Sequence, residues 1–288
     1  MKRITVAAPA KVNLTLHIPA RLENGYHAVE TVMQTVTLFD RVTAEKAWGL
    51  HIAADMPLTE NEADNTAHRA ATLFADAAGV LPHFRIAIQK HIPLQAGLAG
   101  GSADAAGTLV ALNKLCGTPL TADELCALGA RVGADVPFCL RGGTVLATGI
   151  GTALAPLPPL PDCCFVIAKP AFGVSTAAAY AAVDGAPFLP ATDAMQRALQ
   201  TGDLFAVGAA MENRFAQVLR LAEVDRLCDA LKKAGALGAC MTGSGSAVIG
   251  LFETKAAAEA AQSAVGSLCA FSAVAAPFCG GPKIIEEL

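Results

Sequence analysis

The chain has 288 residues, of which 53% are hydrophobic and 16% charged, and its formal net charge is −4. This length allows one large domain or two ordinary ones, and the composition is that of a globular enzyme, which excludes a disordered or fibrous chain. The sequence has no basic block and no stretch that interleaves basic and aromatic residues, so nucleic acid is not expected as a partner.

Three features of the sequence bear on the cellular location of the protein. Nine cysteines are scattered without a Cys-x-x-Cys pair, which indicates reduced thiols and a cytoplasmic protein. The N-terminal stretch MKRITVAAPAKVNL is rejected as a signal peptide, because its apolar run is short and Lys11 interrupts it. Residues 234–252 carry no charge, but five glycines and the string Thr242-Gly-Ser-Gly-Ser246 predict a strand–turn–strand and no membrane partner.

The first half of the chain mixes strands and helices. Residues 3–18 alternate between apolar and polar side chains, which predicts a half-buried strand with a bend at Pro9. A turn at Asn24-Gly25 separates it from a second strand expected over 28–44. The further elements expected are a helix from Asp64 or Asn65 to Ala78, a strand over 84–90, helices over 103–115 and 121–132, and a strand over 143–148.

A proline-rich stretch divides the chain. Residues 152–162 (TALAPLPPLPD) contain four prolines, which cannot continue a helix or a central strand, so a domain boundary is expected there. Helices and strands then mix without regular alternation, so the expected fold class is α+β and not a doubly wound sheet. The elements expected beyond the boundary are a strand over 165–169, helices near 175–183, 203–221 and 223–234, strands on both sides of 242–246, a helix over 255–265 and a strand near 269–276.

Residues 93–106 (PLQAGLAGGSADAA) place a glycine-rich loop directly before a helix. Gly97, Gly100 and Gly101 allow backbone angles closed to other residues and let a ligand approach the main chain. Ser102 is expected to cap the helix, whose free amides and dipole favour an anion, usually phosphate. A tight turn before a packed helix is the alternative. The chain contains neither a Walker loop nor a Gly-x-Gly-x-x-Gly pattern.

Three segments resemble, in order, the kinase superfamily named after galactokinase, homoserine, mevalonate and phosphomevalonate kinases. They are Pro9-Ala-Lys-Val-Asn13, residues 93–106 and Met241-Thr-Gly-Ser-Gly245. Two further stretches resemble the members that act on 4-diphosphocytidyl-2-C-methyl-D-erythritol. These are Asn24-Gly-Tyr-His27, followed by a strand ending at Leu38-Phe-Asp40, and Gly133-Ala-Asp-Val-Pro137.

The resemblance implies a two-domain small-molecule kinase fold, with an N-terminal ribosomal-protein-S5-domain-2-like half and a C-terminal ferredoxin-like half. Residues 1–158 would form the ATP-binding and catalytic domain and residues 159–275 a substrate-closing domain, with a last strand at about 276–288 returning to the first. The protein would be a monomer or a weak homodimer.

The implied reaction transfers the γ-phosphoryl group of ATP, with Mg²⁺, to the 2-hydroxyl of 4-diphosphocytidyl-2-C-methyl-D-erythritol, a step of non-mevalonate isoprenoid biosynthesis. Two alternatives stay open. The acceptor would be mevalonate or homoserine in the first, and the protein would bind nucleotide without catalysis in the second.

The resemblance also implies the ATP site, with Asn65 near the adenosine and the Ser102 hydroxyl near Mg²⁺. The residues implied to bind ATP are Asn65, Pro93, Leu94, Gln95, Ala96, Gly97, Leu98, Ala99, Gly100, Gly101, Ser102, Ala103 and Asp104. Gln95, Ala99 and Ala103 depart from the usual family pattern. Gln95 is expected to fit with a negative φ, and the departures are expected to adjust nucleotide affinity without loss of activity.

Asp135 is the candidate general base for the acceptor hydroxyl, although a turn aspartate is the alternative interpretation. The resemblance places Lys11 against Asp135, where its charge keeps the carboxylate ionised. The residues implied to bind the substrate are Asn13, Tyr26, His27, Tyr180 and Gly243, with the two tyrosines and His27 around the cytidine. Residues 212–215 differ from the family pattern, and no role is expected for them.

Overall fold

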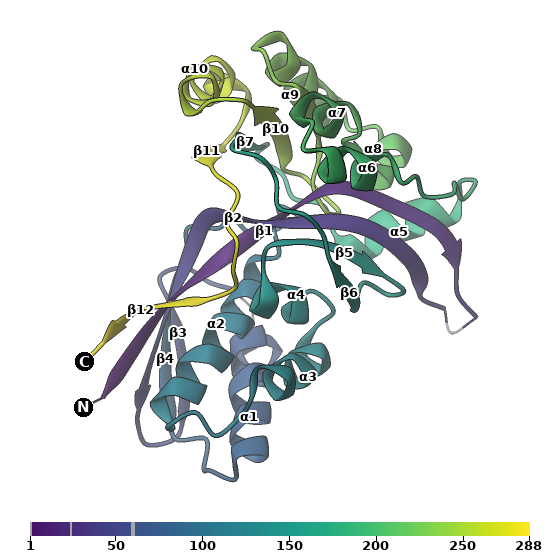
Figure 1. Ribbon diagram of the computed structural model, residues 1–288. Helices are drawn as coiled ribbons and strands as arrows, with labels where there is room; N and C mark the ends of the chain where they lie inside the picture. Colours follow the sequence, from purple (N-terminus) through teal and green to yellow (C-terminus); the bar gives the residue numbers. More distant parts are fainter. Residues whose placement is uncertain (1, 24, 59–60) are drawn as a thin grey trace.

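The computed structural model describes residues 2–23, 25–58 and 61–288. Asn24, one half of the expected Asn24-Gly25 turn, lies outside the described residues. A long hairpin of β1 (Arg3–Arg21) and β2 (His27–Lys46) runs through the molecule and anchors the first of two sheets (Figure 1). This sheet has the order β12-β1-β2-β4-β3, with β5 beside β2, β6 beside β5 and β8 beside β1.

The other strands of this sheet are short. They are β3 (Leu50–Ala54), β4 (Phe84–Gln89), β5 (Thr144–Thr148), β6 (Ala153–Pro156), β8 (Glu212–Asn213) and β12 (Lys283–Glu287). The helices of the first half are α1 (Thr66–Ala78), α2 (Gly100–Leu115), α3 (Ala122–Val132) and α4 (Val136–Arg141), with the 3-10 turn η1 (Glu62–Asp64) before them.

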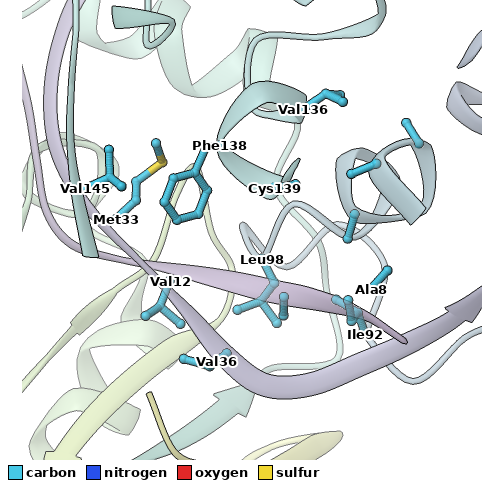
Figure 2. Close-up of a cluster of buried hydrophobic side chains, with 14 of the residues drawn as sticks. Ala8, Val12, Met33, Val36, Ile92, Leu98, Val136, Phe138, Cys139 and Val145 are labelled. Atoms are coloured by element: carbon cyan, nitrogen blue, oxygen red, sulfur yellow. The ribbon is translucent and has the colours of Figure 1, made fainter. Parts of the chain in front are cut away.

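Helix α2 packs closely on the hairpin because Gly107 has no side chain. A Cβ placed on Gly107 would lie 3.0 Å from Cγ2 of Val42 and 3.1 Å from Cβ of Ala8. Figure 2 shows part of the resulting apolar core, in which side chains of β1 and β2 lie beside those of α4 and the glycine loop. The middle of α2 therefore lies directly against the hairpin at the centre of the sheet.

The second half of the chain forms a separate antiparallel sheet of order β11-β7-β10-β9. Its strands are β7 (Cys164–Lys169), β9 (Gly238–Met241), β10 (Val248–Phe252) and β11 (Phe271–Ala275). The helices around it are α5 (Thr176–Asp184), α6 (Ala194–Thr201), α7 (Leu204–Ala209), α8 (Arg214–Leu219), α9 (Ala222–Lys233) and α10 (Lys255–Val265), followed by η2 (Gly266–Leu268). The expected α+β fold class is confirmed.

Two strands from the second half of the chain pair with the first sheet. β12 pairs with the start of β1, with Ile4 opposite Glu287, and β8 pairs with β1 at Thr15 and Leu16. The division of the chain into domains at 158/159 stays a prediction. No helix among residues 2–23, 25–58 and 61–288 is long and apolar enough to cross a membrane.

Residues 203–221 are not the single helix that their pattern predicted. Asp203 accepts hydrogen bonds from the amides of α7, and Asn213 accepts one from the amide of Ala216 in α8, so each begins a new helix. β8 lies between the two helices. The elements that the sequence did not predict are β3, β6, β8, α4 and α6, together with the 3-10 turns η1 and η2. β6 lies inside the proline-rich stretch and pairs only with β5, as an edge strand that tolerates proline.

β1 is buried on both faces, whereas a half-buried strand was expected. Its polar residues Lys11, Asn13, Thr15 and His17 are all less than 10% exposed. The cause is the second half of the chain, because β8 and the turn after β9 lie against this stretch. The polar face of β1 is therefore the inner surface between the two halves.

Candidate active site

A cavity of about 870 Å³ lies where the two halves meet. The glycine loop, the polar face of β1, the end of the hairpin, α5 and the turn after β9 surround it. Most residues predicted to bind ATP or substrate, or to act in catalysis, line this cavity. They are Lys11, Asn13, Tyr26, His27, all residues from Pro93 to Ser102, Asp135, Tyr180 and Gly243. Asn65, Ala103 and Asp104 are not among its lining residues.

The glycine loop is more strongly curved than the sequence indicated. Gln95, Gly97 and Ala99 have φ values of 50°, 73° and 56°, so three alternate residues are left-handed. The expected negative φ of Gln95 is wrong. Its side chain lies on Gly173, where a Cβ would overlap it. Left-handed backbone at non-glycine residues costs on the order of 1 kcal/mol or more each, so surrounding contacts must hold this loop in shape.

The expected helix cap at Ser102 is also wrong. α2 begins at Gly100, its cap position is Ala99, and no side chain there accepts a hydrogen bond. Ser102 is instead the third residue of the helix, and it lines the cavity. The first amides of α2 consequently have no capping side chain, which suits an anionic ligand.

The glycine loop touches the turn formed by residues 242–245. A Cβ on Gly97 would overlap the carbonyl group of Thr242, and a Cβ on Gly243 would lie 2.7 Å from the carbonyl oxygen of Gly97. The amide of Ala247 donates to the carbonyl of Ala96 at 3.2 Å. Glycine is required on both sides because any side chain would separate the two backbones.

Lys11 connects the loop to the candidate base. Its Nζ donates to Oδ1 of Asn13 at 2.6 Å and to the carbonyl oxygen of Gly97 at 2.9 Å, and it lies 3.9 Å from Oδ2 of Asp135. The Lys11 side chain is 5% exposed and that of Asp135 is 40% exposed. Asp135 makes no side-chain capping bond to α4. Its carboxylate is therefore open to the cavity, beside a buried cation.

Asn213 holds the turn in place, although sequence reasoning gave residues 212–215 no role. Its Nδ2 donates to the carbonyl oxygens of Met241 at 2.8 Å and Gly243 at 2.9 Å. The amide of Asn13 donates to Oγ1 of Thr242 at 2.8 Å. These contacts join residues about 30 and 229 positions apart, which explains why no local pattern revealed them.

The far end of the cavity is aromatic. The rings of His27 and Tyr180 stack with centroids 4.7 Å apart, and Phe215 meets Tyr180 edge-on at 4.9 Å. Nε2 of His27 lies 2.7 Å from Oδ1 of Asp184. Because a carboxylate only accepts, this ring nitrogen carries the proton. Burial, followed by the Asp135 charge, raises the pKa of the Tyr180 hydroxyl. Asp184 and Phe215 are site residues that the sequence did not reveal.

Asp104 belongs to a buried ionic cluster behind the loop. Nζ of Lys90 contacts carboxylate oxygens of Asp40 and Asp104. Burial raises the pKa of Asp104 to about 7, against the opposing effect of Lys90. Burial alone would lower the pKa of Lys90, but the charges of Asp104 and Asp40 leave it raised. The cluster therefore holds a lysine that stays charged and a carboxyl group that ionises near neutral pH.

Comparisons with known proteins show the family to which the chain belongs. Residues 65–143 match the family described as GHMP kinases N terminal domain, and residues 195–270 match GHMP kinases C terminal. A homoserine kinase structure from Cytophaga hutchinsonii has the same fold, with a TM-score of 0.77 at 22% identity, covering 98% of this chain and 97% of that one. The chain is thus a GHMP kinase by fold and by sequence.

More similar relatives show to which kinase family within this superfamily the chain belongs. The 4-diphosphocytidyl-2-C-methyl-D-erythritol kinase of Geobacillus kaustophilus is 40% identical over 87% of this chain and 89% of that protein. The kinase of the same name from Caldicellulosiruptor saccharolyticus is 42% identical over 86% and 88%. A crystal structure of 4-(cytidine 5'-diphospho)-2C-methyl-D-erythritol kinase has a TM-score of 0.81 at 35% identity, covering 98% of this chain and 100% of that one. The chain belongs to this kinase family, and the resemblance noted from its sequence is confirmed.

The Asp104 carboxyl makes stability depend on pH. Its pKa is about 7 in the folded protein and near 4 in an unfolded chain, so the folded state retains a proton that the unfolded state has lost between these values. The stabilisation is complete below about pH 4 and disappears as the pH rises through about 7. Urea denaturation at pH 5, 6, 7 and 8 should show the free energy of unfolding of the wild type falling relative to that of Asp104→Asn. A constant difference between the two proteins would contradict the assignment.

Proposed function

We propose that the protein transfers the γ-phosphoryl group of ATP to the 2-hydroxyl of 4-diphosphocytidyl-2-C-methyl-D-erythritol, the acceptor named in its relatives. One observation carries the proposal. The Lys11 ammonium contacts the backbone of the glycine loop and faces the Asp135 carboxylate, so the phosphate site and the candidate base lie side by side. Phosphoryl transfer requires this kind of alignment and charge stabilisation more than covalent chemistry.

The ATP phosphates lie on the glycine loop and the first turn of α2 in this proposal. Left-handed residues at 95, 97 and 99 turn the backbone around an anion, and the uncapped helix start adds a partial positive charge. Ala103 and Asp104 act through this helix, since they do not line the cavity. Asn65 caps α1 through Oδ1, which accepts from the amide of Ala67 at 2.9 Å. Its Nδ2 group remains the candidate contact to the adenosine.

Mg²⁺ fits this site through oxygen donors. Ser102 presents a hydroxyl to the cavity at the third residue of α2, and Mg²⁺ bound to ATP takes most of its ligands from phosphate and water. When bound, the ion neutralises charge on the phosphates. Among residues 2–23, 25–58 and 61–288, no group of three His, Cys, Asp or Glu side chains is arranged to hold a metal.

Asp135 accepts the proton of the acceptor hydroxyl as the oxygen attacks the γ-phosphorus, and the bond from this phosphorus to the bridging oxygen breaks to release ADP. A lysine ammonium has three N–H donors. Lys11 uses two on Asn13 and Gly97, which leaves the third for the Asp135 carboxylate or the transferred phosphoryl group. Asn13 therefore acts by orienting Lys11.

The aromatic end of the cavity holds the cytidine. Tyr26 and Tyr180 offer faces on which a base can stack, and His27 offers polar groups that can recognise its edge. Asp184 accepts from Nε2 of His27 and so holds the ring in place. Gly243 closes the site from the second sheet, next to the glycine loop.

The thiols and the proposed substrate support a cytoplasmic setting. All nine cysteines are free, which supports a reducing, cytoplasmic location. The partner is a small molecule with a cytidine diphosphate group, without nucleic acid or membrane. A monomer or weak homodimer stays a prediction.

The first test is a coupled assay of ADP release with three acceptors. The purified protein with ATP and Mg²⁺ should phosphorylate 4-diphosphocytidyl-2-C-methyl-D-erythritol, with kcat/KM at least about a hundredfold above mevalonate and homoserine, because only the first offers a base to the aromatic pocket. Preference for mevalonate or homoserine would favour the second acceptor class. ATP binding without ADP release from any of the three would favour a non-catalytic protein.

The second test removes the base. Asp135→Asn should bind ATP with unchanged affinity and lower kcat by about a hundredfold or more, since a positioned general base contributes about 10²–10⁴ in rate. Steady-state kinetics and calorimetric titration measure the two quantities. Asp76→Asn, at an exposed position of α1, is the matched control. Turnover of Asp135→Asn within threefold of the control would remove this carboxylate from the mechanism.

The third test separates the acceptor pocket from the ATP site. Asp184→Ala and Tyr26→Ala should each raise the KM of the cytidylated acceptor by about tenfold, the effect of losing the hydrogen bond that holds His27 or one stacking contact. The KM of ATP should stay within about twofold in both. Asp193→Ala, on the exposed surface before α6, is the control. Equal increases in the KM of the acceptor and the KM of ATP would contradict the assignment of the aromatic pocket to the cytidine.

A further inference from the structure

Three ionic side chains lie buried behind the glycine loop and take no direct part in the proposed reaction. Lys90, Asp40 and Asp104 have side chains that are 1%, 0% and 3% exposed. Asp40 is in β2, Lys90 follows β4, and Asp104 is in the first turns of α2. Nζ of Lys90 contacts Asp40 and donates to Oδ2 of Asp104 at 2.7 Å. We refer to these three residues as the Lys90 cluster.

The cluster binds the backbone of the segment that leads into the glycine loop. Oδ1 of Asp40 accepts from the backbone amides of His91 at 2.6 Å and Ile92 at 2.8 Å. These are the two residues directly before Pro93, where the loop begins. A carboxylate with two backbone amides and an ammonium forms strong, charge-assisted bonds. The entry strand is thereby attached to the central hairpin.

The same lysine also binds the helix that follows the glycine loop. Asp104 is the fifth residue of α2, and its bond to Lys90 ties the first turns of this helix to the residue before the entry. A Cβ on Gly100 would lie 3.3 Å from Nζ of Lys90. The buried cation therefore lies directly against the first residue of the helix whose amides face the cavity.

Stability alone does not account for these charges. Buried ion pairs recover little of their desolvation cost, and apolar side chains of similar volume often stabilise a core equally well or better. Oδ1 of Asp104 is also buried without a hydrogen-bond partner, so the cluster is incompletely satisfied. What the ionic contacts do provide is a fixed distance and direction between three segments.

We infer that the Lys90 cluster is a positioning unit that fixes both ends of the glycine loop and so aligns its amides for the phosphates of ATP. The inference rests on the proposed function of this loop. A loop with left-handed turns at Gln95 and Ala99 needs fixed ends to keep a strained backbone in the binding conformation. Lys90 and its carboxylates act through the backbone and do not touch the substrate.

A matched pair of variants at Asp104 tests the inference. Asp104→Asn and Asp104→Leu remove the same charge and leave the Lys90–Asp40 pair intact, but only asparagine keeps an oxygen that accepts from Lys90. ATP binding, measured by calorimetry without acceptor, should weaken at least about tenfold in Asp104→Leu and by less than about threefold in Asp104→Asn. The KM of the acceptor should change less than twofold in both. Amides of residues 95–103 should exchange hydrogen faster in Asp104→Leu only.

Thr108→Val is the control on the same helix. Its hydroxyl is buried and bonds only the helix backbone, at the carbonyl of Asp104, so ATP affinity and loop exchange should remain at wild-type values. Asp104→Ala gives the same contrast with asparagine if the leucine variant does not fold, as judged by circular dichroism. Equal ATP affinity and loop exchange in the leucine or alanine variant and in Asp104→Asn would overturn the inference. Failure of the wild type itself to bind ATP would instead contradict the proposed function. Failure of the inference and failure of the proposed function can therefore be distinguished.

Discussion

The placement of the Lys11 ammonium is the interaction on which the site depends. The cation contacts Asn13 on its own strand, the carbonyl of Gly97 in the glycine loop and the carboxylate of Asp135 before α4. Each of these groups comes from a different part of the first half of the chain. A buried ammonium needs such partners, because an unpaired charge at this depth would be strongly unfavourable. The requirement to satisfy the lysine therefore brings the glycine loop and the candidate base together.

Burial of Lys11 requires the second half of the chain. The polar face of β1 would be open to solvent if β8 and the turn at 242–245 did not lie against it. Asn213 holds that turn by two carbonyl groups, and the turn meets Gly97 backbone to backbone. The low exposure of the lysine and the shape of the cavity thus share one cause, which is close contact between two glycine-containing turns.

The sequence could predict the parts of the site that local patterns carry. The alternation in β1 placed Lys11 and Asn13 on one polar face, and the glycines before α2 indicated an anion site. Local patterns could not reveal Asp184 or Asn213, since each acts on residues far away in the sequence. The left-handed Gln95 and Ala99 were missed for another reason, because intrinsic preferences disfavour this conformation and only tertiary contacts impose it.

Charge is distributed unevenly along the cavity. This distribution matches the order of the phosphate and base groups that the cavity would bind in the proposed reaction. At the loop end the cavity presents backbone amides, the α2 dipole and the Lys11 ammonium. At the other end it presents aromatic rings and His27, whose Nε2 lies against Asp184. A chain with a net charge of −4 can still attract a polyphosphate, because the local field near the loop is set by these few groups at short range and not by the total charge. In the proposed reaction the acceptor hydroxyl lies between the two ends, where Asp135 is the exposed carboxylate beside Lys11.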